Sequence, residues 1–271
     1  MKFPQIIFGT FQYADSEELS IITKCAYENG IVGFDTSPSY NTEKMLGTSL
    51  SQLMQYKGIS RDNLFVQDKI DGWQMEETKG HIACHVESGL MRLGMEYLDV
   101  LFVHWPFPDY LYETWQSFAE LRKNGKIRYL GLSNVRCHHV KRLIERTGIK
   151  PDVVQIERHP LRICKTDVNY FHSQNITVEA YSPVCRMDSR LLNSRLLKEI
   201  SYKYNKSIGQ VILRWHVDTN VIPVFMTKKE YRIKENTNIF DFSLSGQEID
   251  AINRLNINYK IFVESVCCPG I

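Results

Sequence analysis

Four residues with acid–base side chains lie in the first half of the chain, and three of them are regularly spaced. Lys69 follows Asp35 by 34 residues, His104 follows Lys69 by 35, and Tyr40 lies five residues after Asp35. Asp35, Lys69 and His104 each lie near the end of an apolar run of strand length. Because this step is about one strand–helix repeat, the three side chains are expected at equivalent ends of neighbouring parallel strands.

Together these residue types predict proton transfer to a carbonyl group. A phenol has a pKa near 10 and donates protons poorly at neutral pH, whereas a neighbouring ammonium lowers that pKa. We expect Lys69 to lower the pKa of Tyr40, and Asp35 to pair with Lys69. His104 could hydrogen-bond the oxygen on which negative charge develops. Each residue alone is more often structural, but the four together favour reduction of a carbonyl, provided that a hydride donor binds alongside.

Apolar runs alternate with amphipathic stretches along the whole chain, and this order positions the four residues. Several runs are apolar at consecutive positions, which is typical of parallel strands buried on both faces. The strands are expected at residues 5–11, 32–37, 64–70, 98–105, 129–134, 153–157, 177–183 and 221–227. Helices are expected from Ser16, as N-cap, and at 75–93, 111–122, 137–146, 191–204, 208–217, 229–236 and 247–255.

Eight strand–helix units favour a closed (β/α)8 TIM barrel over an open doubly wound sheet. The sequence has no linker rich in Gly, Ser or Pro, and it lacks the G-x-G-x-x-G turn of dinucleotide-binding open sheets. We therefore predict one barrel domain over residues 1–271, with parallel strands, a short N-terminus and a short C-terminal tail.

Composition and net charge limit the classes of partner that the protein can bind. The 271 residues are 43% hydrophobic and 24% charged, with a formal net charge of +2, which excludes a disordered chain and argues against a nucleic-acid partner. No signal peptide or apolar run of membrane-spanning length is visible, so we expect a cytoplasmic protein without a membrane partner.

The cysteines and histidines do not predict a metal site. The seven cysteines include the vicinal pair Cys267-Cys268 but no C-x-x-C pair, so thiols are expected rather than a disulfide framework or structural zinc. His81 and His85 share a helical face, but no third ligand is apparent, and we expect no metal.

The motifs at the strand ends resemble those of the aldo-keto reductase superfamily, in the right order and over nearly the whole chain. The matching residues are Asp35-Thr36-x-x-x-Tyr40-x-x-Glu43-x-x-x-Gly47, Lys69, His104-Trp105-Pro106, Gly125-Lys126-Ile127-Arg128, Gly131-Leu132-Ser133-Asn134, Gln155-Ile156-Glu157-x-His159-Pro160, Glu179-Ala180-Tyr181-Ser182-Pro183 and Arg232-Ile233-Lys234-Glu235-Asn236. This resemblance implies an NADPH-dependent barrel that binds the dinucleotide across the strand ends.

By the same resemblance Tyr40 is the general acid, tuned by Lys69 and Asp35, and His104 orients the carbonyl. Ser133, Asn134 and Gln155 match residues that bind the nicotinamide amide, and Tyr181 matches the ring that stacks on the nicotinamide. The other expected cofactor contacts are Thr10, Asp35 and Ser182, then Thr227, Lys228 and Arg232 near the 2′-phosphate, and Glu235 and Asn236 near the adenine. Phe11, Trp73 and Trp105 are expected to line the substrate pocket.

The expected function is an NAD(P)H-dependent oxidoreductase that reduces an aldehyde or ketone to an alcohol, or catalyses the reverse. NADH stays open as cofactor because Phe225 and Met226 stand where the family usually has Pro and Gly. Two alternatives are a non-catalytic NADPH-binding regulatory subunit and a nicotinamide-using dehydratase or epimerase. The expected partner is a small carbonyl or alcohol substrate, and the protein is expected to be a monomer, with a homodimer open.

Overall fold

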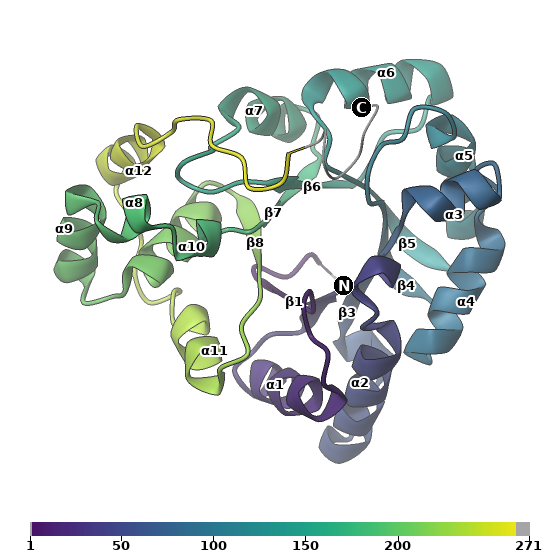
Figure 1. Ribbon diagram of the computed structural model, residues 1–271, viewed down its shortest axis with the longest axis horizontal. Helices are drawn as coiled ribbons and strands as arrows, with labels where there is room; N and C mark the ends of the chain where they lie inside the picture. The colour runs from purple at the N-terminus through teal and green to yellow at the C-terminus, as the bar shows by residue number, and fades with distance from the viewer. Residues whose placement is uncertain (1, 264–271) are drawn as a thin grey trace.

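The computed structural model describes residues 2–263, and these residues form eight parallel strands closed into a barrel. Each strand pairs with the next along the chain, and β8 pairs with β1. Helices surround the ring of strands (Figure 1), so the structure confirms the expected TIM barrel. The strands are β1 Ile7–Gly9, β2 Gly33–Asp35, β3 Phe65–Ile70, β4 Leu98–Val103, β5 Ile127–Ser133, β6 Val153–Glu157, β7 Thr177–Tyr181 and β8 Val221–Phe225.

All eight expected strands are present, but the helices differ from the prediction in several places. The helices are α1 Ser16–Glu28, α2 Glu43–Lys57, α3 Gly72–Glu77, α4 Ala83–Leu93, α5 Leu111–Lys123, α6 Cys137–Thr147, α7 Lys165–Ser173, α8 Ser189–Leu192, α9 Arg195–Tyr204, α10 Ile208–Asp218, α11 Glu230–Thr237 and α12 Gly246–Asn253. Neither α2 nor α7 was predicted, although Leu46, Leu50 and Leu53 of α2 have helical spacing and form its buried face. The N-cap of α1 is Asp15, which accepts from the backbone N–H of Glu18, and not Ser16.

Two expected helices are divided. Residues 75–93 separate into α3 and α4 because Lys79 and Gly80 adopt positive φ values of 49° and 84°, which end a right-handed helix. Residues 191–204 separate into α8 and α9 because Ser194 starts a new helix by capping the backbone N–H of Leu197.

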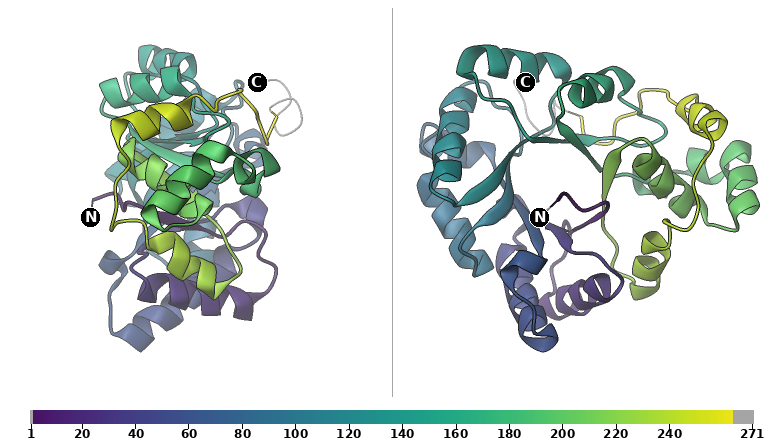
Figure 2. Two further views of the ribbon diagram at one scale, coloured as in Figure 1. Left: turned by 90° about the vertical axis from the view of Figure 1, so that its left-hand side faces the viewer. Right: turned by 180° about the vertical axis from the view of Figure 1, so that it is seen from behind.

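The core has an inner and an outer part. Alternate strand residues such as Phe65, Val100 and Phe102 fill the barrel interior, where Phe3 also packs on Phe65 and Tyr129. The other strand faces pack against the helices. Figure 2 shows the N-terminal residues and the yellow segment that ends at Val263 at opposite ends of the barrel.

Close packing between α2 and α4 explains why Gly47, a residue of the family motif, is a glycine. A Cβ at Gly47 in α2 would lie 2.4 Å from the carbonyl oxygen of Leu93, so only glycine lets α2 approach the end of α4 this closely. The position is buried and leaves no room for a side chain.

The described cysteines Cys25, Cys84, Cys137, Cys164 and Cys185 are free thiols, whereas Cys267 and Cys268 lie outside the described residues. Within residues 2–263, no helix has the length and apolar character needed to cross a membrane.

Candidate active site

The buried ion pair between Lys69 and Asp35 forms the floor of the site. Lys69 Nζ donates to both Asp35 carboxylate oxygens at 2.8 Å and to the backbone oxygen of Thr36 at 2.9 Å. Burial opposes the charge on Lys69, but the charges of Asp35 and Tyr40 raise the pKa of the ammonium above its usual value. Lys69 is therefore a cation held in one place by two neighbouring strands, β2 and β3.

Tyr40 lies over this pair, in a short 3-10 turn, Pro38–Tyr40, that follows β2. Lys69 Nζ is 5.0 Å from the centre of the Tyr40 ring. Burial raises the pKa of Tyr40 to about 12, although the charge of Lys69 and a hydrogen bond from it act in the opposite direction. Lys69 thus lowers the pKa of Tyr40, as expected, but in the protein alone desolvation outweighs the ammonium and the net shift is upward.

His104 lies beside Tyr40, with 5.8 Å between the ring centres and the rings edge to face. Its Nδ1 is hydrogen-bonded to the carboxylate of Asp71, a buried residue that the sequence analysis missed. The signal was available, because Asp71 directly follows β3 and so lies at the same barrel end as the other site residues. Asn134 fixes the His104 backbone by donating its amide to the His104 oxygen at 2.9 Å.

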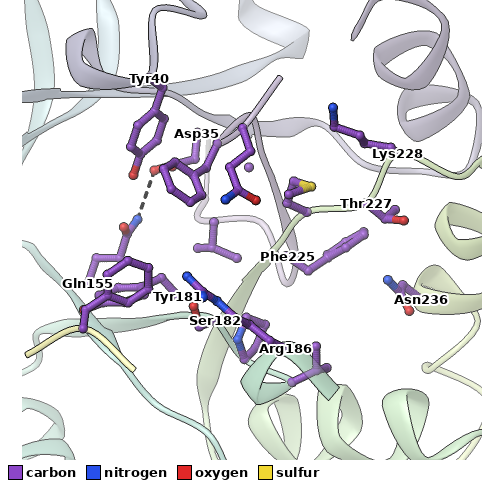
Figure 3. A pocket seen from close by; sticks show the side chains of 18 of the residues that line it. Asp35, Tyr40, Gln155, Tyr181, Ser182, Arg186, Phe225, Thr227, Lys228 and Asn236 are labelled. Carbon is purple, nitrogen blue, oxygen red and sulfur yellow. Dashed lines mark hydrogen bonds between the residues drawn. The ribbon is translucent and has the colours of Figure 1, made fainter. Parts of the chain in front are cut away.

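A layer of polar side chains lies inside the barrel and holds Asp35. Gln67 and Gln155 each donate their Nε2 to Asp35 Oδ1, at 2.8 and 3.0 Å, and each also donates to Glu179 Oε2 at 2.9 Å. Figure 3 shows Gln155 directed toward Asp35. Because the Gln155 amide nitrogen is used inside the protein, only its oxygen is left for a ligand.

A cavity of about 780 Å³ opens above these residues, a size typical of cofactor sites. Most expected site residues line it: Phe11, Asp35, Tyr40, His104, Trp105, Ser133, Asn134, Gln155, Tyr181, Ser182, Thr227, Lys228, Arg232 and Asn236. In Figure 3, Tyr40, Gln155 and Tyr181 lie at one side of this cavity, and Thr227, Lys228 and Asn236 lie at the other.

Four expected residues do not line the cavity. Lys69 lies beneath Tyr40. Thr10 is buried, and its hydroxyl donates to the backbone oxygen of Asp35. Glu235 instead accepts a 2.7 Å hydrogen bond from Arg232. The prediction for Trp73 is wrong: α3 carries this residue outside the cavity, where it is 56% exposed and its ring packs on His85.

The cavity fits an extended dinucleotide. At one end, Tyr181 donates to Asn134 Oδ1 at 2.6 Å, which fixes an aromatic ring beside an amide. At the other end, Lys228 and Arg232 supply positive charge. Lys228 forms an ion pair with Glu18 at 3.2 Å, and Arg232 forms one with Glu235 at 2.7 Å. An aromatic platform and exchangeable cations at opposite ends suit a planar ring and a phosphate.

Arg186 is a further cation that the sequence analysis missed. It lines the cavity from the turn after β7, where Cys185, Arg186 and Met187 adopt positive φ values of 51°, 51° and 55°. Three such residues in succession are costly without glycine, and strain of this kind clusters at functional sites. No sequence motif marked this residue, because its position depends on the turn.

The segment before Val263 forms one wall of the cavity. Glu157, at the end of β6, accepts hydrogen bonds from the backbone N–H groups of Ile261 at 2.7 Å and Phe262 at 2.8 Å. Phe262 lines the cavity with its ring centre 5.7 Å from that of Tyr181. A buried carboxylate thus ties this segment to the barrel.

The chain belongs to the aldo/keto reductase family, whose family model matches residues 5–257. The protein is therefore an oxidoreductase of carbonyl compounds that uses NADP(H).

Individual relatives agree with this assignment. The chain is similar to a glyoxal reductase of Bacillus subtilis, at 35% identity over 96% of this chain and 92% of that protein. It is also similar to the methylglyoxal reductase DkgA of Escherichia coli O157:H7, at 30% identity over 93% of this chain and 90% of that protein. Among solved structures, a Bombyx mori aldo-keto reductase in complex with NADP matches with a TM-score of 0.90 and 28% identity, covering 97% of this chain and 92% of that one.

Proposed function

We propose that the protein reduces small aldehydes, with 2-oxoaldehydes such as glyoxal and methylglyoxal as the substrate class, and that Tyr40 is the general acid. The observation that carries the proposal is the Lys69–Asp35 ion pair directly beneath a tyrosine that faces the cavity. The substrate class is supported by the printed names of the two bacterial relatives. Phe11 and Trp105 supply an apolar wall beside Tyr40.

The cofactor would lie along the cavity with its nicotinamide next to Tyr40. Tyr181 offers its ring for stacking, Asn134 and Ser133 offer polar groups for the amide, and Lys228, Arg232 and Arg186 offer charge for the phosphates. When bound, the reduced nicotinamide supplies the hydride of the reaction.

The chain's own residues handle the proton. Tyr40 donates its phenolic proton to the carbonyl oxygen, and the adjacent Lys69 stabilises the phenolate that remains. Asp35 holds Lys69 in place. The imidazole of His104 hydrogen-bonds the same oxygen and so orients the carbonyl.

The barrel cavity is completed by residues of one chain, and this supports the proposal that the protein acts as a monomer. We propose the cytoplasm as its location because its scattered thiols suit a reducing compartment. Size-exclusion chromatography with light scattering tests the oligomeric state, and a mass near twice 31.6 kDa would contradict it.

The substitution Tyr40→Phe tests the mechanism. It removes the hydroxyl but keeps the ring, so kcat/KM for methylglyoxal should fall by about 100- to 10,000-fold. NADPH affinity, measured by fluorescence titration, should stay within about two-fold. Tyr202→Phe, at a tyrosine that is 91% exposed, is the matched control and should leave both quantities unchanged.

Two outcomes would contradict the proposal. A Tyr40→Phe enzyme that keeps most of its rate would exclude Tyr40 as the acid. NADPH binding without turnover of any aldehyde or ketone in a panel would favour the regulatory subunit, and product formation without net NADPH consumption would favour a dehydratase or epimerase.

A further inference from the structure

Asp71 occupies the N-cap position of α3, directly after β3, but its side chain does not cap the helix. An aspartate at this position ordinarily accepts hydrogen bonds from the backbone N–H groups of the first turn. Here only backbone groups of Asp71 bond the first turn: its N–H donates to Gln74 Oε1 at 2.9 Å, and its backbone oxygen accepts from the N–H of Gln74 at 3.1 Å.

The carboxylate is instead bound by residues from two other strand ends. Asp71 Oδ1 is hydrogen-bonded to His104 Nδ1, at the end of β4. From the loop after β2, the backbone N–H of Ser39 donates to Oδ2 at 3.0 Å. The hydroxyls of Ser37 and Ser39 each donate to the carboxylate at 3.4 Å.

These donors keep the buried carboxylate ionised. Burial alone would raise the pKa of Asp71, but the hydrogen bonds from His104 and Ser39 and the charge of His104 hold that pKa below its usual value. The other ionisable groups around His104 are Tyr40 and, beneath Tyr40, the Lys69–Asp35 pair.

An anion at Nδ1 determines which ring nitrogen can serve the substrate. Since a carboxylate accepts and cannot donate, Nδ1 must carry a proton, and Nε2 is the nitrogen left for the cavity. In neutral His104, Nε2 would then be a bare acceptor that repels a carbonyl oxygen. Only the imidazolium form carries a second proton, on Nε2, that can be donated to that oxygen.

We propose that Asp71 is a positioning residue that acts through His104, by holding the Nδ1 proton and favouring the imidazolium whose Nε2–H binds the carbonyl oxygen. This inference rests on the proposed role of His104 in carbonyl reduction. As the carbonyl carbon gains hydride and forms its C–H bond, the π pair moves to the oxygen, which takes the proton of Tyr40. The imidazolium keeps its own proton and stabilises the developing charge.

Asp71→Asn tests the proposal with glyoxal and methylglyoxal as substrates. The amide is the same size but uncharged, so we expect kcat to fall about 10- to 100-fold, by analogy with other residues that orient a functional histidine. NADPH affinity should stay within about two-fold, because the cofactor contacts are unchanged. Asp15→Asn, at the capping aspartate of α1, is the matched control and should change neither.

A double-mutant cycle separates this role from a purely structural one. If Asp71 acts through His104, Asp71→Asn should cost less than about two-fold in a His104→Gln background. An equal loss in both backgrounds, or an unchanged rate in Asp71→Asn, would overturn the proposal. If Asp71→Asn does not fold, Asp71→Ser keeps a residue able to cap α3 and carries the same test.

The experiments distinguish a failure of the proposed role of Asp71 from a failure of the proposed function. Loss of activity in Tyr40→Phe with no effect of Asp71→Asn would refute only the role of Asp71. Retained activity in Tyr40→Phe would refute the proposed acid whatever Asp71→Asn shows.

Discussion

Glu179 is a carboxyl group enclosed inside the barrel, and its protonation should make the stability of the protein depend on pH. It is fully buried on β7, where its Oε2 accepts hydrogen bonds from Gln67 and Gln155, and its Oε1 has no hydrogen-bond partner among the described residues. Burial raises the pKa of Glu179 from 4.5 to about 7, although the two amides act in the opposite direction. The carboxyl therefore stays protonated in the folded protein at pH values where it ionises in the unfolded chain.

The sign and size of the effect follow from this difference. Between pH 4.5 and 7 the folded state binds the extra proton, so the free energy of unfolding falls as pH rises through this range. The contribution is fully present below pH 4.5 and is lost above about 7. At about 1.4 kcal/mol for each unit of pKa difference, the loss is about 3 kcal/mol.

Glu179→Gln removes the ionisation and should flatten this dependence. Urea unfolding at pH values from 5 to 8 gives the free energy of unfolding of both proteins. The variant should gain about 2 to 3 kcal/mol relative to the wild type as pH rises from 5 to 8. Other buried carboxyls, such as Asp68, contribute equally to both proteins and cancel in the difference.

Glu17→Gln, at an exposed glutamate of α1, is the matched control and should show a difference that does not vary with pH. A wild-type-minus-Glu179→Gln difference that stays constant within about 0.5 kcal/mol from pH 5 to 8 would refute the assignment of a protonated Glu179.

Two further predictions concern the walls of the cavity. Trp105→Ala should raise KM for methylglyoxal by about 5- to 30-fold, through the loss of about 1–2 kcal/mol of apolar contact. Trp73→Ala should leave KM within about two-fold, because of these two residues only Trp105 lines the cavity. Equal effects of the two substitutions in steady-state assays would contradict this assignment. Glu157→Gln should weaken the attachment of residues 261 and 262 and raise KM by about 3- to 10-fold with little change in kcat, and protease cleavage near Phe262 should be faster than in the wild type. An unchanged cleavage rate would show that Glu157 does not hold the segment.

The arrangement of the barrel could be predicted because it depends on local patterns. Continuous apolar runs mark buried parallel strands, and the near-equal steps between Asp35, Lys69 and His104 place them at one end of the barrel. The prediction omitted α2 and α7, although Leu46, Leu50 and Leu53 of α2 have helical spacing. It also joined α3 to α4, because apolar spacing continues across the two residues with positive φ.

Much of the site was determined by the amino-acid types and their order: an ammonium, a carboxylate, a phenol and an imidazole at successive strand ends specify acid–base chemistry before any coordinates are known. What only the tertiary structure decided is the surroundings of these groups. The pKa of Tyr40 is raised because the effect of desolvation exceeds the opposite effect of the Lys69 charge. Desolvation results from burial, which only the packed protein produces. The contact of Asp71 with His104 and the separation of Trp105 from Trp73 depend on the direction of each side chain at its strand end, which sequence spacing does not specify.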